Sequence, residues 1–573
     1  MVFPSLFLVY VFKVASAHAQ QFRNVPSTFQ EDLTADSASF LRTEGDWLTR
    51  QMVQSRDYEL WPVTVFSKGT GEAAASNYDL RYDDKIENIM IKGYDHVEGG
   101  SFQYYDDVPT SPDIVELSLE DALRKTNTDA FIIMKDGVIV YEKYFGNFKP
   151  NNRHVIYSMT KSYIGVIVAE LMMKRLIDEN ELVSNYVGEL KKSEGLNNVT
   201  VRQLLDMTAA YQYEEDNPEA EACKADASTL LFSEIRKTIQ LDPSKVGVDL
   251  PIPFGCEQVA EFYSTKPNQA AAEFMHYYTN GYYVRYPGAQ NSRDFLVSLK
   301  KKESTLPNGE VFEYKTSNTN ALALLVDTVL KENDGKDNLP LSSVEYFEDR
   351  FWSKFGAHSD GFITVDNTRF PYWGGYGQIT LRDGVLFGNM MLNDGHSIDG
   401  TQVVPKAIID DILKGGTPEN IKQFSEAKGQ FTTFMNSLVT KDKGPGDPYT
   451  LVAEDYLKAI GEPNGVQKSF AYRNQWWVIP DHAIFQNGIF GQNIWVDYDA
   501  QIVIGKFSSN PSINDHTLLD LPMFLEISTY FQEKFEFNAR TSKSAKKKNK
   551  STKKKKVSKT EKWTVVKLMT FIF

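Results

Sequence analysis

A serine and a lysine three positions apart, Ser158 and Lys161, have residue types and a spacing that suggest chemistry. Side chains at positions i and i+3 of a helix share one face, so the Lys161 amine can reach the Ser158 hydroxyl. A serine hydroxyl is a weak nucleophile until a base removes its proton, and a lysine whose pKa burial depresses can be that base. A helix N-terminus at Ser158 also offers a backbone N–H to a developing oxyanion. Taken alone, this short pattern more often marks a surface serine and a lysine on a helix face.

Two further stretches make the pattern more specific. Residues 138–142 precede it and residues 199–208 follow it, in a characteristic order and spacing. Together with residues 157–162 they resemble the β-lactamase-related serine hydrolases. That family includes class C β-lactamases, D-alanyl-D-alanine carboxypeptidases, family VIII esterases and, most similar to this chain, 6-aminohexanoate-dimer hydrolases. The resemblance covers roughly residues 120–535, and it implies that Ser158 is the nucleophile and Lys161 its proton acceptor.

A second motif of this family is a tyrosine followed two positions later by a small polar residue. Tyr314 and Thr316 fit it, although threonine stands where the family usually has asparagine or serine. The resemblance implies that the Tyr314 phenol relays a proton between nucleophile and leaving group. It also implies that Thr316 contacts the substrate. The alternative is a buried, structural tyrosine.

A third family motif, Lys-Thr-Gly or His-x-Gly on an edge strand, has its counterpart in residues 485–497. The resemblance implies that the backbone N–H of Ile489 completes the oxyanion hole with that of Ser158. Gly488 then lets a substrate approach the strand closely. Gln486, expected to contact substrate, stands where a cation often stands; losing that cation argues against β-lactamase as the main activity. The alternative is a glycine-rich hairpin edge with no catalytic role.

Two more stretches belong to the same resemblance. Residues 373–383 are similar to a structural segment, and Thr380 or Asp383 is expected to cap a helix there. Tyr211 and the acidic residues after it fall in a region that lines the pocket in this family, so we expect Tyr211 to contact substrate. A solvated acidic loop is an equally weighted alternative.

Hydrophobic spacing predicts the elements that position these groups. Asp136 and Gly137 between two β-forming runs predict a hairpin, and residues 494–504 predict another near the end. Apolar residues spaced three and four apart after Ser158 predict a long helix with one apolar face. Further helices are expected over residues 201–207, 319–332, 380–392 and 518–535. Strands at both ends with helices between them predict one sheet built from both ends of the domain, plus a helical insert.

Composition excludes several classes of function. The 573 residues are 42% hydrophobic and 24% charged, which suits a large core in two to four units. Residues 541–573 hold twelve lysines and one glutamate, so the rest is more acidic than the net charge of −14 suggests. Such a body is not expected to bind nucleic acid.

The eight histidines show no metal-ligand spacing, so no metal or other cofactor is expected. Cys223 and Cys256 exclude a disulfide framework, and whether they pair stays open.

The two ends of the chain suggest targeting and tethering. An apolar run before Ala17-His18-Ala19 predicts a signal peptide over residues 1–19 and secretion, although no lysine or arginine precedes the run. An untrimmed apolar N-terminus is the alternative. Asn198 begins a glycosylation acceptor, Asn-Val-Thr. Residues 536–573 predict a basic, disordered tail. Of its two readings, a tether to anionic surfaces and a merely solvated tail, the solvated tail is favoured.

The expected organisation is a signal peptide (1–19), an N-terminal extension (20–110), a catalytic domain (111–535) with an insertion at about 214–300, and the tail (536–573). The expected fold is α/β (α+β) of the serine β-lactamase/transpeptidase type, an antiparallel sheet flanked by helices plus a mostly helical subdomain. The protein is expected to be an amidase, esterase or carboxypeptidase that hydrolyses a small amide or ester substrate through an acyl-enzyme on Ser158. The rival is a catalytically silent scaffold or binding protein. The oligomeric state is left open.

Overall fold

The computed structural model describes residues 47–55, 63–69, 81–94, 114–213, 291–302, 307–333, 339–366, 368–417, 471–511 and 519–532. The predicted signal peptide, both cysteines, residues 214–290 of the insertion and the basic tail lie outside the described residues. Secretion and the role of the tail therefore stay predictions. Among the described residues, no helix has the length and apolar character that crossing a bilayer requires.

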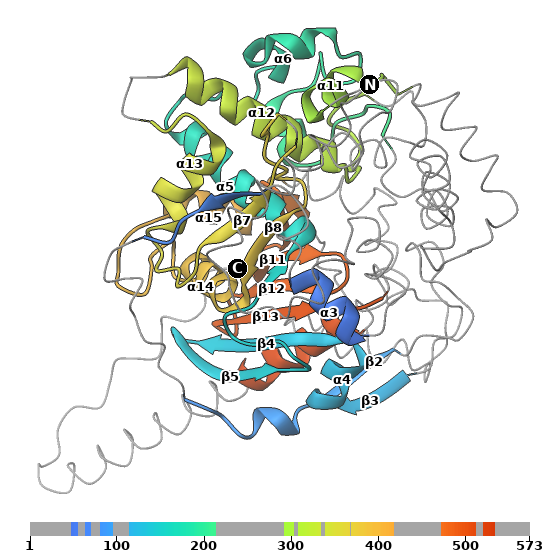
Figure 1. Ribbon diagram of the computed structural model, residues 1–573, viewed down its shortest axis with the longest axis vertical. Helices are drawn as coiled ribbons and strands as arrows, with labels where there is room; N and C mark the ends of the chain where they lie inside the picture. The colour runs from blue at the N-terminus through green and yellow to red at the C-terminus, as the bar shows by residue number, and fades with distance from the viewer. Residues whose placement is uncertain are drawn as a thin grey trace, which may run out of the picture.

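A seven-stranded antiparallel sheet forms the centre of the molecule. Its order is β5-β4-β13-β12-β11-β10-β9, so strands from the two ends of the domain meet at the β4–β13 pair (Figure 1). The strands are β4 (Thr128–Lys135), β5 (Val138–Tyr144), β9 (Ala471–Arg473), β10 (Trp476–Ile479), β11 (Ala483–Gly488), β12 (Gln492–Asp497) and β13 (Ile502–Ser508). Both predicted hairpins, and the sheet built from both ends, are confirmed.

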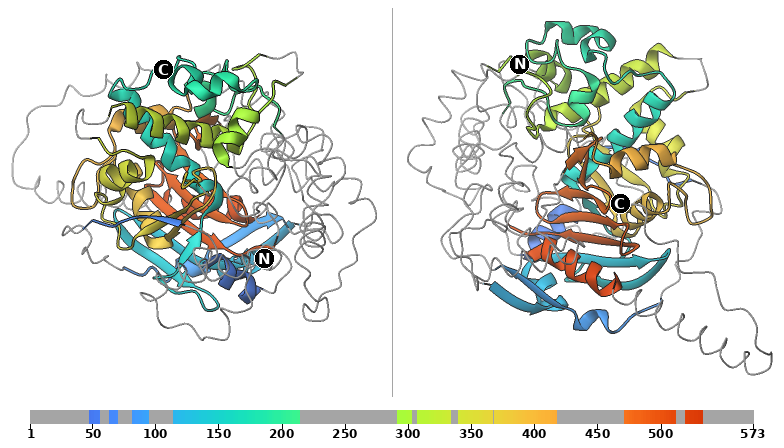
Figure 2. Two further views of the ribbon diagram at one scale, coloured as in Figure 1. Left: turned by 45° about the horizontal axis from the view of Figure 1, so that its top comes forward. Right: turned by 180° about the vertical axis from the view of Figure 1, so that it is seen from behind.

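Helices cover both faces of this sheet (Figure 2). Alternate residues of β4 enter different clusters: Ile132 joins the core beneath α5 and α14, whereas Phe131 and Ile133 join the core on the opposite face. Helix α14 (Leu381–Leu392) packs against one face. Helix α4 (Leu119–Lys125) and the closing helix, residues 519–532, supply the other cluster. Because both faces are covered, the middle of β4, residues 130–134, is an unbroken apolar run.

A helical layer lies above the sheet (Figure 1). It contains α6 (Val183–Tyr186), the 3-10 helix η6 (Gly188–Lys192), α7 (Val201–Leu205), α11 (Ser292–Ser298), α12 (Thr316–Glu332) and α13 (Ser343–Phe347), followed by a π-helical turn, η9 (Glu348–Trp352). Helix α5 (Lys161–Met173) runs between this layer and the sheet. The predicted single apolar face of α5 is wrong, because residues 161–171 are buried on all sides.

The N-terminal residues add to the body of the fold. Strand β1 (Val63–Phe66) opens a four-stranded sheet of order β1-β7-β8-β6, with β6 (Arg153–Val155), β7 (Gly361–Thr364) and β8 (Gly377–Thr380). Strand β2 (Met90–Tyr94), after the turn η4 (Ile86–Asn88), pairs with β3 (Ile114–Ser118). Helix α3 (Trp47–Ser55) is anchored by Gln51, whose Nε2 donates to Asp129 Oδ1 at 2.7 Å and to the Phe145 carbonyl oxygen at 3.0 Å.

The tip of the β9–β10 hairpin is inserted into the helical layer. Asn474 and Gln475 form this tip with φ values of 49° and 65°. The carbonyl oxygen of Asn474 approaches Gly165 of α5 so closely that a Cβ there would lie 2.0 Å away. Gln475 donates from Nε2 to the Leu204 carbonyl oxygen at 2.9 Å, and its Oε1 accepts from Thr319 Oγ1 at 2.6 Å. The tip therefore connects α5, α7 and α12.

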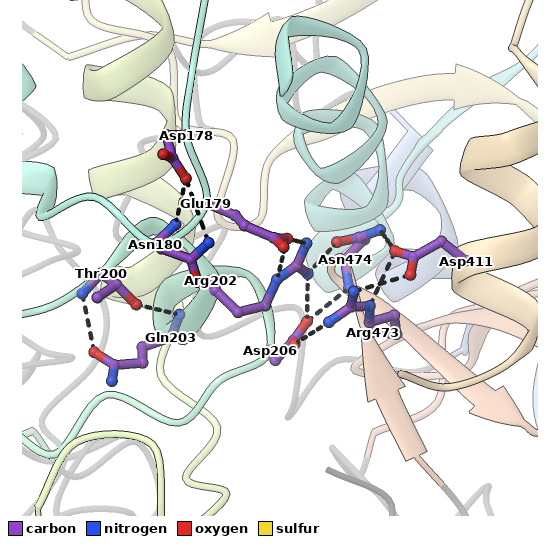
Figure 3. Close-up of polar contacts among 10 residues, drawn as sticks. All are labelled: Asp178, Glu179, Asn180, Thr200, Arg202, Gln203, Asp206, Asp411, Arg473 and Asn474. Atoms are coloured by element: carbon purple, nitrogen blue, oxygen red, sulfur yellow. Dashed lines mark hydrogen bonds and ion pairs between the residues drawn. The ribbon is translucent and has the colours of Figure 1, made fainter. Parts of the chain in front are cut away.

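A network of charged side chains holds this tip in place (Figure 3). Arg473 contacts Asp206 at 2.7 Å, and Asp411 of α15 (Lys406–Leu413) through two nitrogen atoms at 2.9 and 3.0 Å. Arg202 of α7 contacts Asp206 at 3.1 Å and pairs with Glu179. Burial opposes ionisation of Asp411, but the neighbouring Arg473 guanidinium outweighs it and lowers the pKa of that carboxyl. Sheet edge and helices are thus connected by ion pairs.

Candidate active site

Ser158 lies in a short helical turn that leads directly into α5. This turn, η5, is a 3-10 helix over Tyr157–Thr160, and the α-helix begins only at Lys161. In a 3-10 helix, side chains three positions apart lie above one another. Ser158 therefore precedes the long helix, which corrects the expectation that it starts it, while the turn still brings its side chain to Lys161.

The Lys161 amino group lies at the centre of the site. The side chain is 1% exposed, and Nζ lies 2.9 Å from Ser158 Oγ and 2.5 Å from the carbonyl oxygen of Gly374. It also lies 5.0 Å from the centroid of the Tyr314 ring, within the range of a cation–π contact. The three side chains that the sequence pointed to, Ser158, Lys161 and Tyr314, are therefore together in the structure.

Tyr314 reaches the site from the segment just before α12. Its half-buried ring stacks on Trp477, with the centroids 5.7 Å apart and an interplanar angle of 19°. The Tyr472 ring meets it at a near-perpendicular angle, with the centroids 6.0 Å apart. Both partners flank the inserted hairpin tip, one on β9 and one on β10. These aromatic neighbours were not predicted, because only the fold brings β9 and β10 to Tyr314.

Lys315 fixes the backbone beside Tyr314. It is 1% exposed, and its Nζ donates to the carbonyl oxygen of Ala209 at 2.7 Å and to the Glu313 carboxylate. Burial opposes ionisation of Glu313, but the Lys315 and Lys302 ammonium groups outweigh it and lower the pKa of the Glu313 carboxyl. Lys315 escaped prediction because a single lysine beside a tyrosine has no distinctive spacing.

Strand β11 and the turn after it lie against η5. A Cβ atom at Gly488 would lie 2.4 Å from the carbonyl oxygen of Ile156, so the close approach requires a residue without a side chain. The rings of Tyr157 and Phe490 meet edge to face with their centroids 5.2 Å apart. Ile489, half-buried between Gly488 and Phe490, is therefore held beside the turn that carries the nucleophile.

Tyr211 is buried inside the helical layer. It is 0% exposed, its hydroxyl donates to Asn318 Oδ1 at 2.6 Å, and it lies 2.6 Å from Ser317 Oγ. The Lys315 Nζ lies 4.9 Å from its ring centroid. Tyr211 therefore supports the start of α12, and its contact with substrate stays a prediction.

Gln486 and Thr316 are also buried. Gln486 is fully buried on β11, and its Nε2 points to the carbonyl oxygen of Met159, 3.5 Å away, so it lies beneath η5. Thr316, at the start of α12, is buried against Gly374. Both residues support the site from within, and their contact with a substrate stays a prediction.

Residues 373–383 supply one backbone group of the site and the cap of helix α14. The Gly374 carbonyl oxygen accepts from Lys161, a role that no side-chain pattern could reveal. Thr380 caps α14 by accepting from the backbone N–H of Asp383, so the predicted cap is confirmed. Across the described ranges, no group of three or more His, Cys, Asp or Glu side chains is arranged to hold a metal ion.

Comparisons with known proteins agree with this architecture. Residues 118–520 match the family model described as Beta-lactamase. A 6-aminohexanoate-dimer hydrolase of Paenarthrobacter ureafaciens is 27% identical over 396 residues, which cover 69% of this chain and 75% of the relative. A solved structure from Bacillus anthracis, provisionally assigned as a 6-aminohexanoate-dimer hydrolase, matches with a TM-score of 0.57 at 20% identity, covering 89% of this chain and 99% of that one. That structural likeness concerns the fold alone.

The family match spans more than half of the chain and includes every residue of the site. The described architecture is the antiparallel sheet with helices that the β-lactamase/transpeptidase-like fold requires. This chain therefore belongs to the β-lactamase family of serine hydrolases.

Proposed function

We propose that this protein hydrolyses an amide or ester bond through an acyl-enzyme on Ser158. The observation that carries the proposal is the distance of 2.9 Å between Lys161 Nζ and Ser158 Oγ, beside the Tyr314 ring. A base within hydrogen-bond distance of a hydroxyl is the arrangement that nucleophilic catalysis by serine needs.

The reaction proceeds in two half-reactions. With Lys161 neutral, its Nζ accepts the Ser158 proton as Oγ attacks the substrate carbonyl carbon. The tetrahedral intermediate collapses, the bond to the leaving group breaks, and Lys161 or Tyr314 supplies the proton that the leaving amine or alcohol takes. Water then attacks the acyl carbon and passes its proton to Lys161 or Tyr314. As the bond between the acyl carbon and Ser158 Oγ breaks, that group returns the proton to Oγ, and the acid is released.

The developing negative charge requires donors that are already in place. We assign this role to the backbone N–H groups of Ser158 and Ile489. The approach of Gly488 to Ile156 and the contact between Tyr157 and Phe490 support the assignment, because they hold the two turns together.

Amides are the first substrate class to test. The relative from Paenarthrobacter ureafaciens is named a 6-aminohexanoate-dimer hydrolase, and two amino acids joined as a dimer are linked by an amide. Gln486 replaces the cation that would bind a β-lactam carboxylate, and it is fully buried. A β-lactam is therefore expected to be a poorer substrate than a linear amide or an ester.

A comparison of wild type with Ser158→Ala tests the proposal. We expect wild type to form a covalent adduct with a fluorophosphonate probe, read by intact mass, and to hydrolyse members of an amide and ester library. We expect Ser158→Ala to form no adduct and to unfold at the wild-type temperature, because Ser158 is only partly buried. A wild-type protein that neither reacts nor hydrolyses would favour the scaffold, and wild-type turnover by the alanine variant would refute Ser158 as nucleophile.

A further inference from the structure

We infer that Gln492 is a positioning residue that fixes the turn bearing the Ile489 N–H. The inference rests on the proposed function, because it concerns the second donor of the proposed oxyanion hole. Gln492 opens strand β12, pairs with Gly488 across the hairpin, and is fully buried. Its amide group lies between the turn and strand β13.

The Gln492 side chain extends the β12–β13 ladder. The last backbone pair of these strands in this direction is Asn493 with Lys506. Beyond it, Gln492 Nε2 donates to the Ser508 carbonyl oxygen at 2.6 Å, and Gln492 Oε1 accepts from the Ser508 N–H at 3.2 Å. The side-chain amide thus pairs with Ser508 as a peptide group would.

The same amide reaches the turn. Gln492 Nε2 also lies 3.3 Å from the carbonyl oxygen of Ile489. The adjacent carbonyl, of Phe490, accepts from the backbone N–H of Asn510 at 3.3 Å. The two peptide groups that directly follow Ile489 are therefore held from the β13 side, and this restrains the turn that continues from the Ile489 N–H.

The turn needs such restraint because its backbone is unfavourable. Phe490 has φ of 63°, a left-handed value that a non-glycine residue adopts at a cost of about 1 kcal/mol or more, and Gly491 has φ of 95°. On its other side, the Phe490 ring contacts Tyr157. Ser508 is itself a rigid anchor, since its Oγ donates to the Asn127 carbonyl oxygen at 2.9 Å.

The test replaces Gln492 by methionine, which keeps the volume and removes the amide. Removing one oxyanion-hole donor costs about 10²–10³ in rate, so a donor that is present but displaced should cost about 10–100-fold. We expect that loss in the rate of Ser158 phosphonylation by a fluorophosphonate probe, and in kcat for p-nitrophenyl acetate, with KM changed by less than about threefold. Gln492→Glu is the second variant, for use if the methionine variant folds poorly. It keeps the size of the side chain but places an oxygen against the carbonyl oxygens of Ile489 and Ser508, so we expect the same loss of rate.

Gln51→Met is the matched control. Gln51 is also a buried amide that donates to two oxygens and accepts one backbone N–H, but it lies on α3, and its partners Asp129, Phe145 and Asn147 are not residues of the turn. We expect it to lower thermal stability and leave the phosphonylation rate within about twofold of wild type. Wild-type rates in folded Gln492 variants, or an equal loss in the Gln51 control, would overturn the inference. An unreactive wild type would instead overturn the proposed function.

Discussion

The phenol of Tyr314 is the part of the proposed site that a single substitution isolates most cleanly. Tyr314→Phe removes the hydroxyl and keeps the ring that contacts Lys161 and stacks on Trp477. We expect kcat to fall by about 10²–10⁴, the usual contribution of a proton-transferring group, and the free energy of unfolding to change by less than about 1 kcal/mol.

Tyr472→Phe is the control for this prediction. The Tyr472 ring contacts both Tyr314 and Trp477, but Tyr472 has no assigned role in proton transfer. Steady-state kinetics and urea unfolding of both variants check the prediction. Similar kcat losses in the two variants would show that the aromatic cluster, and not the Tyr314 hydroxyl, supports turnover.

Residue-scale prediction succeeded where local spacing decides the geometry. Ser158 and Lys161 meet because three positions make one helical turn, and Thr380 caps α14 because its hydroxyl reaches an N–H three positions later. Gln486 could not be placed in this way. A strand sends successive side chains to opposite faces, and whether Gln486 faces η5 or a substrate depends on packing from distant segments. The Gly374 carbonyl has no side-chain signal at all.

At the scale of elements, the inserted β9–β10 tip and its ion pairs decide stability. In Arg473→Met the buried Asp206 carboxylate, 3% exposed, loses a partner at 2.7 Å, and Asp411 loses two contacts. Removing one member of a buried ion pair is strongly destabilising. Because Arg202 still pairs with Asp206, we expect a loss of about 2–4 kcal/mol in the free energy of unfolding, measured by urea denaturation.

Arg124→Met supplies the contrast for this prediction. Arg124 also pairs with a carboxylate, Glu120, but both side chains are exposed, at 55% and 39%. Exposed pairs contribute less than about 1 kcal/mol, so this variant should unfold close to wild type. If both variants lose the same stability, burial of the Arg473 network is not what stabilises the tip.

Periodicity predicted the position of α5 but not its surroundings. The spacing of large apolar residues after Ser158 indicated one buried face, and the helix was found there. Its other faces are buried as well, since the helical layer lies above it and the hairpin tip contacts Gly165. Spacing identifies the face with the largest side chains, but it does not reveal that α12 and the hairpin tip, both more than a hundred positions away, cover the other faces.

At the scale of the whole molecule, one buried carboxyl makes stability depend on pH. Asp383 is fully buried, and burial raises the pKa of its carboxyl to about 6, despite hydrogen bonds from Thr380 and the His358 N–H. The folded state then holds this proton more tightly than the unfolded state. Its contribution to stability is therefore fully present below about pH 4 and is lost as the pH rises through about 6.

Asp383→Asn tests this dependence because the amide does not titrate. We expect the difference in unfolding free energy between variant and wild type to shift by about 2 kcal/mol in favour of the variant between pH 4.5 and pH 7. Urea unfolding at both pH values measures it, and taking the difference cancels groups common to the two proteins. A difference that does not change with pH would contradict the raised pKa.

The general architecture was predictable because strong hairpin and helix signals alternate along the chain. The hairpins around Asp136-Gly137 and over residues 494–504 were expected, and their strands β4 and β13 are found as neighbours. The place of β1 was not predictable, because a four-residue strand carries little pattern and its partner, β7, lies about 300 positions later. Gln51 illustrates the same limit, since its partner Asp129 is 78 positions away.

The β4–β13 pair has a consequence for the synthesis of this chain on the ribosome. Ser508 Oγ contacts the Asn127 carbonyl oxygen across 381 positions, at the end of this strand pair. At a synthesis rate of ~5–20 residues per second, β4 lacks its partner strand for roughly 20 to 80 s, until β13 has been synthesised. An unpaired apolar edge invites pairing with other nascent chains. We therefore expect a truncated chain that ends before β13 to aggregate, whereas the full chain stays in solution.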